Sequence, residues 1–258
     1  MTALVQYAVD GAVARLTLDS PHNRNALSSV LVQQLHDGFR AAASNPSVRC
    51  VVLGHTGGTF CAGADLTEAA GRDLGDVAVD RAREMTYVLR SILELPVPVI
   101  GAINGNVRAG GMGLVGACDI VVAGPESTFA LTEARIGVAP SIISLTLLPK
   151  LNPRASGRYF VTGEKFGIDE AARIGLITER ANSADELAAT VAALAAEVAK
   201  GSPQGLATSK ALTTAAILED FDRHAEELTQ QSAGLFGSDE AREGMLAFLE
   251  KRPPRWVT

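Results

Sequence analysis

The sequence predicts a mixed α/β fold with a mostly parallel sheet, followed by a helical C-terminal region. Three short, continuous apolar runs are typical of strands covered on both faces: Cys50–Leu53, Val99–Ile103 and Ile120–Ala123. Helical patterns separate these runs, and such alternation favours parallel strands joined by crossover helices. Beyond about Leu176 the strand patterns stop and helical patterns continue almost to the end of the chain.

The N-terminal segment predicts a β-hairpin and then a capped helix. Leu4–Tyr7 and the alternating apolar residues after the turn at Asp10 and Gly11 have the pattern of paired antiparallel strands. Ser28 or Ser29 then precedes a stretch in which apolar residues recur every three or four positions. A serine at this place can accept a hydrogen bond from a free N–H of the first turn, so we expect a helix to begin there.

Two further helices are predicted from residues that typically end or begin a helix. One covers about Val79–Leu93 and ends before Pro96 and Pro98, because proline cannot continue a helix. The other begins at a capping box formed by Ser183 and Glu186, followed by apolar residues at helical spacing.

The C-terminal part of the chain reads as helical throughout. Gly201-Ser202-Pro203 interrupts the helix that starts at the capping box. Three more helical segments are predicted after this break, reaching about Lys251. We therefore expect two parts: residues 1–200 form an α/β core, and residues 201–258 form a helical C-terminal region.

Composition excludes several functional classes. Of the 258 residues, 47% are hydrophobic and 20% are charged, which is typical of a globular protein. The net charge of −6 argues against nucleic-acid binding, because phosphate contacts need a basic surface. Neither a signal peptide nor a membrane span is predicted. Cys50, Cys61 and Cys118 lie in apolar runs, which is typical of buried thiols in a reducing cytoplasm, so we expect a cytoplasmic protein.

The strongest indication of a functional site is a turn of small residues after a strand, which occurs twice. The run Cys50–Leu53 leads into Ala62–Asp65, and the run Val99–Ile103 leads into Ala109–Gly113. Each places small residues where the chain leaves a strand and begins a helix, so a ligand can approach free backbone N–H groups. Either turn alone is better explained as a tight turn. Two such donors converging from different turns are what an oxyanion hole requires.

A competing motif lies in the second turn. Gly111–Gly116 fits the G-x-G-x-x-G dinucleotide fingerprint, which should follow its strand at once and precede an acidic residue about 20 positions later. Here several residues intervene after Ile103, Asp119 comes too early, and Glu133 lies well past the next strand. We interpret the match as accidental. The four histidines are scattered without metal-ligand spacing, so no metal site is expected.

Carboxylates are therefore the expected acid or base groups, and Glu133 is the main candidate. It lies in Phe129–Gly137, a largely apolar stretch after a strand. Burial there would raise its pKa toward the working pH. The alternative is an ordinary glutamate at the start of a helix, paired with Arg135. The sequence supports the two interpretations about equally.

Several segments together resemble the crotonase superfamily, also called the enoyl-CoA hydratase/isomerase family. They are Asn25–Ser28, Phe60–Leu66, Ala109–Gly111, Ala117–Ile120, Glu133 with Ile136-Gly137, Tyr159–Glu164, Ala171–Leu176 and Glu243–Lys251. They agree in order and spacing over essentially the whole chain. The resemblance implies a repeated ββα spiral core with C-terminal helices used in trimerisation, as a homotrimer or as a homohexamer built from two trimers.

The resemblance also implies roles for individual residues. The family binds acyl-CoA thioesters and stabilises the enolate formed at the thioester carbonyl. The N–H groups of Ala64 and Gly110 would donate to the oxyanion, and Glu133 would act as the acid or base. Arg24 would lie near the CoA phosphates, and Phe248 and Lys251 would reach the CoA of a neighbouring subunit. The turn residues Ala62, Gly63, Asp65 and Leu66 would hold the adenine and pantetheine portion. Ala26 and Gly111 would also contact CoA.

No separate cofactor is implied, because the CoA thioester is the substrate. Hydratases of the family typically carry a second glutamate, and aligning on Ala117–Ile120 puts Gly113 at that position. In this respect the chain resembles the Δ3-Δ2-enoyl-CoA isomerases, which use a single glutamate. The segment Gly137–Ser144 resembles members that act on branched substrates.

Three hypotheses follow. The leading one is an enoyl-CoA hydratase-like lyase that adds water to C3 of a 2-enoyl-CoA, while Glu133 delivers or removes the C2 proton. The second is the isomerase. The third, from another class, is a CoA-ester-binding protein without catalysis. The expected partners are the acyl-CoA substrate and further copies of the chain, with no nucleic acid and no membrane.

Overall fold

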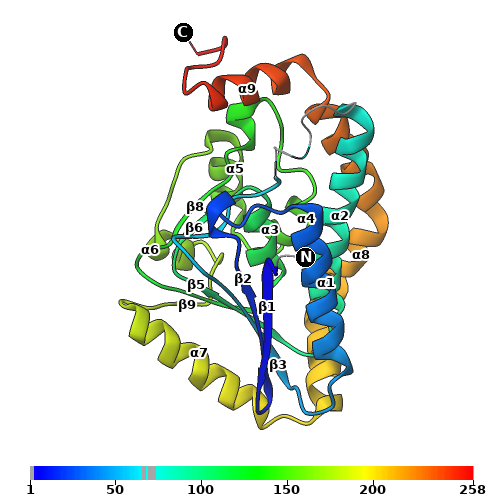
Figure 1. Ribbon diagram of the computed structural model, residues 1–258, viewed down its shortest axis with the longest axis vertical. Coiled ribbons are helices and arrows are strands. Elements are labelled where there is room, and N and C mark those ends of the chain that lie inside the picture. Colours follow the sequence, from blue (N-terminus) through cyan, green and yellow to red (C-terminus); the bar gives the residue numbers. More distant parts are fainter. Residues whose placement is uncertain (1–2, 66–67, 69–73, 258) are drawn as a thin grey trace.

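The structure is a computed structural model that describes residues 3–65, 68 and 74–257. Its main sheet has the strand order β1-β2-β3-β5-β7-β9 (Figure 1). The strands are β1 Val5–Asp10, β2 Val13–Leu18, β3 Cys50–His55, β5 Val99–Ile103, β7 Ile120–Ala123 and β9 Glu179–Arg180. β1 and β2 form the expected antiparallel hairpin, and the other pairs are parallel. This confirms the predicted α/β class, although β9 lies beyond the point where strand patterns stop.

A second, parallel sheet contains strands that the sequence did not indicate. It consists of β4 (Thr59–Cys61), β6 (Asn106–Arg108) and β8 (Thr128–Ala130), in that order. Each has three residues, which is too short for a detectable alternation, and β4 and β6 end directly before the turns at Ala62–Asp65 and Ala109–Gly113. The pairs β3-β4, β5-β6 and β7-β8 follow one another, with α2 and α3 after the first two pairs. This repeat confirms the ββα spiral core.

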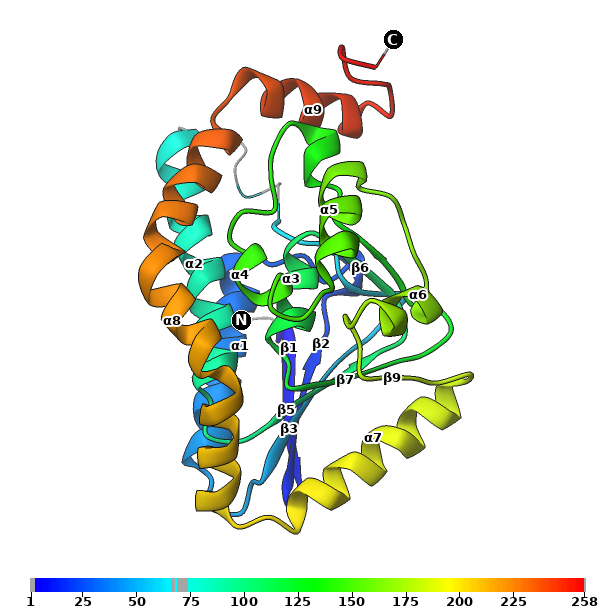
Figure 2. The ribbon, with the colours of Figure 1, turned by 180° about the vertical axis from the view of Figure 1, so that it is seen from behind.

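Helices surround the main sheet on both faces. The α-helices are α1 Ser29–Ser44, α2 Leu74–Glu94, α3 Gly110–Ala117, α4 Ser144–Leu147, α5 Pro153–Thr162, α6 Ile168–Arg173, α7 Ala184–Ala199, α8 Pro203–Phe236 and α9 Asp239–Leu249; two 3-10 helices that matter below are η1 Pro21–Asn23 and η3 Glu133–Ile136. In Figure 1, α1, α2 and α8 lie on one side of the sheet and α7 on the other, and Figure 2 gives the same arrangement from behind.

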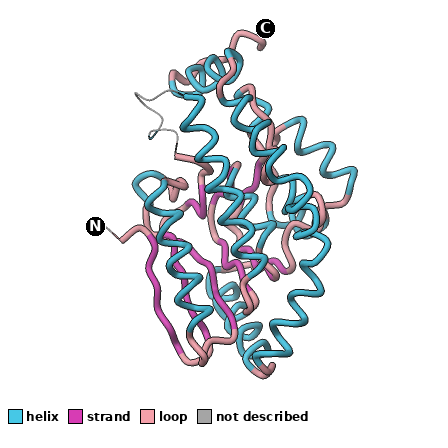
Figure 3. The backbone as a smooth tube through the Cα atoms, turned by 90° about the vertical axis from the view of Figure 1, so that its right-hand side faces the viewer, coloured by secondary structure: helices cyan, strands magenta, loops and turns pink. Residues whose placement is uncertain are grey.

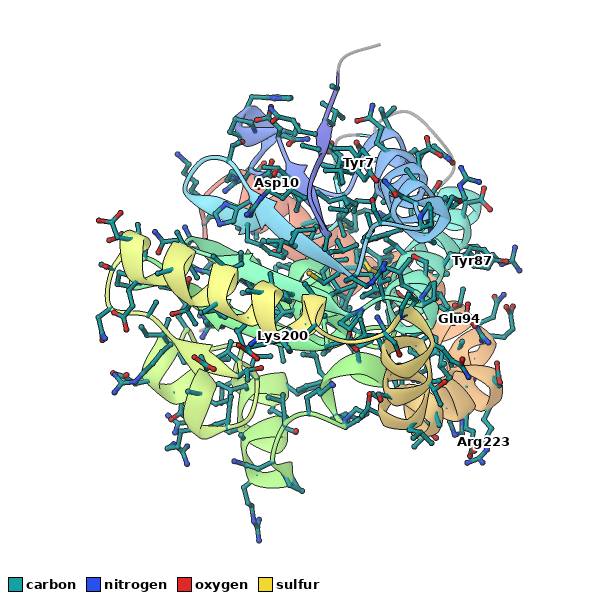
Figure 4. The ribbon with its side chains drawn as sticks, turned by 90° about the horizontal axis from the view of Figure 1, so that it is seen from below. Tyr7, Asp10, Tyr87, Glu94, Lys200 and Arg223 are labelled. Atoms are coloured by element: carbon teal, nitrogen blue, oxygen red, sulfur yellow. The ribbon has the colours of Figure 1, made fainter. Side chains whose placement is uncertain are left out.

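The apolar strands are buried on both faces, as their composition predicted. In β3, Val51 and Leu53 belong to the large core cluster that also contains residues of α1, α2 and α8. The alternate residues Cys50 and Val52 face a smaller cluster with Leu187 of α7. Figure 4 shows α7 lying across the strands. The period-2 alternation of a strand therefore sends its neighbouring side chains into two different cores.

Side-chain caps fix the starts of the predicted helices. Ser28 Oγ accepts a hydrogen bond from Leu31 N–H at 3.3 Å, so Ser28 is the cap of α1. Ser183 Oγ accepts from Glu186 N–H at 3.1 Å, as the capping box predicted. The returning bond differs from that motif, because the Glu186 carboxylate accepts from Asn182 N–H at 2.8 Å, one residue before the cap.

The C-terminal helices pack on the core. The prediction of three helical segments after Pro203 is wrong, because α8 runs unbroken to Phe236 and α9 follows it. Figure 3 shows the long helices packed side by side, and Ile217 and Phe221 of α8 are buried in the large core cluster. Packing against the core overrides the weak local helix propensity that suggested further breaks. Among the described residues, no helix combines the length and apolarity of a membrane span.

Candidate active site

The two glycine turns lie against each other where β4 and β6 end. Gly63 has a φ of +94°, and a Cβ added to it would lie 2.8 Å from Ala109 Cβ and 3.3 Å from Gly110 N. Gly111 is enclosed as tightly, since a Cβ there would lie 2.7 Å from the Cys61 carbonyl oxygen. Neither position has room for a side chain. The close approach of the two backbones makes the turns one site.

Ala64 and Gly110 each present a backbone N–H that has no acceptor in the described part of the chain. The groups around Ala64 are used: Leu27 N–H donates to Gly63 O at 2.8 Å, and Asp65 N–H donates to Leu27 O at 3.3 Å. Gly110 is the first residue of α3, where an N–H has no partner within the helix. It is also buried, and a buried unpaired N–H is costly unless a ligand satisfies it. These two groups have the chemistry of an oxyanion hole.

Met85 of α2 covers the second donor, a contact that the sequence did not reveal. A Cβ added to Gly110 would lie 2.5 Å from Met85 Cε and 3.3 Å from Leu27 Cδ1. In the sequence, Met85 lies at helical spacing from Leu89 and Ile92, which is typical of an ordinary core residue. Only the packing of α2 on the turn brings its methyl group to the site.

The residues expected around CoA are gathered beside the first turn. Arg24 O accepts a hydrogen bond from Ala62 N–H at 3.2 Å, and Asn23 Nδ2 donates to Asp65 Oδ2 at 3.2 Å. Ala26 is buried next to this junction. The Arg24 side chain is exposed and has no ion-pair partner among the described residues. Its guanidinium is therefore free to bind a phosphate.

Three of the expected CoA residues are not joined to this group. Leu66 lies outside the described residues, so its role stays a prediction. Phe248 lies near the end of α9 and is 57% exposed, and Lys251 is exposed just beyond that helix. Their expected contact with a neighbouring subunit also stays a prediction.

Glu133 is a buried carboxyl group at the start of η3. Its residue exposure is 7%, and Oε2 has no hydrogen-bond partner. Burial raises the pKa of Glu133 to about 7, and a hydrogen bond from its own backbone opposes this shift. Arg135 does not pair with it, because the Arg135 Nε donates to Thr162 O at 3.0 Å. The interpretation of a glutamate paired with Arg135 is therefore wrong. The expected burial of Glu133 is confirmed, and its role as an acid or base stays a prediction.

The segment that carries Glu133 is held by the last helix. A Cβ added to Gly244 of α9 would lie 2.5 Å from the Ile136 carbonyl carbon. From the other side, a Cβ added to Gly137, which has a φ of +78°, would lie 2.6 Å from the Glu240 carbonyl carbon. Two glycines thus let the backbones of α9 and η3 meet directly.

Gly113 lies in an apolar environment with no space to spare. A Cβ added to it would lie 2.5 Å from Ile143 Cγ2 and 3.3 Å from Leu89 Cδ1. Both of these side chains are buried. The position where a second glutamate was expected is therefore closed by hydrocarbon.

The cysteine thiols are unsuited to acid–base chemistry at the site, although Gly63 N–H donates to Cys61 Sγ at 3.4 Å. All three cysteines are free and buried, and burial raises the pKa of Cys61 and of Cys118 to about 12, which makes them inert thiols. Nowhere in the described ranges do three His, Cys, Asp or Glu side chains gather as a metal site would require.

Two surface hollows lie away from the turns. One, of about 410 Å³, lies between α1 and α2 and is lined by His36 and Tyr87, and Figure 4 shows Tyr87 projecting outward. The other, of about 370 Å³, lies beside α7 and is lined by Arg15 and His55. Neither is lined by Glu133, Ala64 or Gly110.

The spiral ββα core with two donors from adjoining turns defines a crotonase-type protein. The family model described as enoyl-CoA hydratase/isomerase matches residues 8–258, and the chain belongs to that family.

Known relatives agree over the full length of the chain. The crystal structure of an enoyl-CoA hydratase from Mycobacterium avium has a TM-score of 0.93 and 65% sequence identity, and all of both chains is covered. An enoyl-CoA hydratase from Mycobacterium smegmatis has a TM-score of 0.80 and 31% identity, again with all of both chains covered. The carnitinyl-CoA dehydratase of Proteus mirabilis is 31% identical over 262 residues, covering 99% of each protein.

Proposed function

We propose that the protein is an enoyl-CoA hydratase-like lyase that adds water across the C2–C3 bond of a 2-enoyl-CoA. The observation that carries this proposal is the buried Glu133, whose Oε2 has no partner and whose pKa is about 7. A carboxyl group with such a pKa can give up or take a proton near neutral pH. The names of the relatives, enoyl-CoA hydratase and carnitinyl-CoA dehydratase, support chemistry at this bond.

The two free N–H groups would stabilise the intermediate. As the oxygen of water bonds to C3, the electron pair of the double bond moves onto the thioester oxygen and forms an enolate. Ala64 and Gly110 donate to that oxygen, each contributing on the order of 3 kcal/mol. Glu133 then protonates C2, which restores the carbonyl group. The proton that the water loses passes to solvent, and solvent returns a proton to Glu133 before the next turnover.

A second candidate, a Δ3-Δ2-enoyl-CoA isomerase, is favoured by Gly113. No second carboxylate takes a proton from water there, because Ile143 and Leu89 fill the space. Isomerisation needs one base that removes a proton from C2 and returns it to C4, and Glu133 can do both steps. The third candidate, a CoA-ester-binding protein without catalysis, gives no reason to keep Glu133 buried and unpaired.

The remaining proposals concern binding and assembly. Arg24 would contact the CoA phosphates, and no cofactor besides the CoA of the substrate would be needed. The protein would act as a homotrimer or a homohexamer, with Phe248 and Lys251 reaching a neighbour's CoA. Its exposed apolar side chains in the last helix and tail, which include Leu249 and Val257, support such an assembly. Three buried free thiols support a cytoplasmic location.

Separate assays with a 2-enoyl-CoA and a 3-enoyl-CoA test these candidates through the absorbance of the conjugated enoyl group. Loss of absorbance with the first supports hydration, gain with the second supports isomerisation, and no change with either contradicts both. Rates measured against pH add a second criterion. Hydration needs protonated Glu133 and should slow above pH about 7, whereas isomerisation needs the ionised form and should slow below it.

Replacing Glu133 by Gln tests the residue itself. We expect turnover to fall by about 10²–10⁴-fold, because the amide cannot transfer a proton. Circular dichroism should show an unchanged fold. Turnover within twofold of the wild type would contradict a mechanism through Glu133.

A further inference from the structure

Ala109 has a backbone conformation that residues with a side chain avoid. Its φ is 47° and its ψ is −122°, at the N-cap of α3. Arg24 also has a positive φ, of 60°, but its ψ of 38° puts it in the left-handed helical region, which other residues tolerate. The ψ of Ala109 lies far outside that region, where glycine alone is comfortable. Ala109 is therefore strained, and it directly precedes the Gly110 donor.

A hydrogen bond fixes the direction of the peptide between Ala109 and Gly110. The Ala109 carbonyl accepts a hydrogen bond from Met112 N–H at 2.8 Å, which turns this oxygen toward α3. In a trans peptide the C=O and the N–H point in opposite directions, so the Gly110 N–H points out of the helix. Rotating this peptide by about half a turn would bring ψ of Ala109 near the left-handed value of about +47°. That rotation would relieve the strain, but it would turn the donor away.

The methyl group of Ala109 is in contact with the opposite turn. A Cβ on Gly63 would lie 2.8 Å from Ala109 Cβ, so the methyl group lies close against the Gly63 backbone. Ala109 N–H also bonds to Ala130 O of β8, although at 3.4 Å. The residue is thus held by one turn, one strand and one helix while its own backbone preference opposes the arrangement.

We propose that Ala109 is a positioning residue that holds the Gly110 N–H toward the oxyanion, with its methyl group acting as a spacer between the two turns. This inference rests on the proposed function, because it assumes that Gly110 serves as a donor. The strained backbone lowers the stability of the folded protein, but it keeps the Gly110 N–H oriented before substrate binds. Glycine at position 109 would remove both the strain and the spacer.

The test is Ala109→Gly, with Ala192→Gly as the matched control. Ala192 is exposed in α7, across the main sheet from the turns. We expect A109G to raise Tm by about 2–4 °C, because the loss of strain exceeds the entropy cost of a glycine. A192G should lower Tm, as glycine does within a helix.

Kinetics provide the readout that a purely structural role would not change. We expect A109G to lower kcat about tenfold with KM changed by less than about threefold, since the donor matters most in the transition state. A192G should leave both unchanged. Binding of acetoacetyl-CoA, whose enolate absorbs in the near ultraviolet, reports on the same donor without turnover, and A109G should weaken the enolate band.

The outcomes separate this inference from the proposed function. If the wild type is active and A109G keeps its kcat and its enolate band, the positioning role is contradicted. If A109G melts at or below the wild-type temperature, the strain is contradicted. If the wild type neither turns over an enoyl-CoA nor develops an enolate band, the proposed function itself fails, and the role of Ala109 fails with it.

Discussion

Two charged side chains are buried among the described residues, and they differ in their hydrogen-bond partners. Lys210 of α8 is 4% exposed, and its Nζ donates to Ile92 O at 2.7 Å and to Val97 O at 3.2 Å. The same Nζ lies 2.7 Å from Asp119 Oδ2. Glu133 is 7% exposed, and its Oε2 has no partner.

The two side chains differ in whether their buried polar atoms have partners. Burial lowers the pKa of Lys210, while Asp119 opposes that shift and the three acceptors match the three N–H groups of the ammonium. Such a group joins α8 to the end of α2 and to the start of β7. Glu133 gains no comparable stabilisation. An unsatisfied buried carboxyl lowers stability, and an acid or base in a catalytic site is one reason for a protein to contain one, as proposed above for Glu133.

The largest effect is expected when the ammonium group of Lys210 is removed. Lys210→Met removes the ammonium and leaves Asp119 and two carbonyl groups without it. We expect the free energy of unfolding, measured by urea denaturation, to fall by about 3–5 kcal/mol, as for other broken buried ion pairs. The matched control is Lys200→Met, because Lys200 is exposed and forms a surface ion pair with Glu197. A loss as small as that of the control would show that Lys210 does not hold the helices together.

Replacement of Glu133 should change the stability in the opposite direction, by raising the free energy of unfolding. Folding raises the pKa of Glu133 from 4.5 to about 7, so ionisation destabilises the folded state. The penalty is absent below pH 4.5, grows as the pH rises to about 7, and is complete above that, where it amounts to about 3 kcal/mol. Glu133→Gln should therefore stabilise the protein at pH 8 and have little effect at pH 4.5.

Melting temperatures at the two pH values test this prediction. Glu126→Gln is a suitable control, because Glu126 is exposed and carries no burial penalty. If E133Q shifts Tm equally at pH 4.5 and pH 8, Glu133 does not carry the burial penalty.

The smallest effect is expected when a second glutamate is introduced at Gly113. Gly113→Glu should lower the free energy of unfolding by about 1–3 kcal/mol, because the side chain collides with Ile143. It should not increase hydration of a 2-enoyl-CoA. Gly113→Glu combined with Ile143→Ala should recover part of the lost stability, as measured by urea denaturation. A gain in hydration by the single variant would show that the space is open to a carboxylate after all.

Apolar patterns and one helix cap made most of the fold predictable from the sequence. The buried strands were found because they are continuous apolar runs, and α7 was found because Ser183 precedes apolar residues at helical spacing. β4, β6 and β8 were missed because three residues carry no period. α8 was divided wrongly because its continuity depends on packing with residues that are distant in the chain.

The site was predictable in its parts but not in its environment. The glycine turns, Glu133 and Gly113 all stand out in the sequence, together with the family resemblance. The burial of Glu133, the contact of Met85 with Gly110 and the conformation of Ala109 arise only when separate elements pack. No local pattern reports such distances, so these properties had to come from the structure.

The contact between α9 and η3 has a consequence for how the protein is made. The ribosome releases the chain from its N-terminus, so the segment that carries Glu133 emerges well before Gly244 of its covering helix. Until α9 is synthesised, that segment lacks the backbone on which it rests. A nascent chain or a prematurely terminated one therefore holds both glycine turns and the acidic residue before the helix that supports the acidic segment exists.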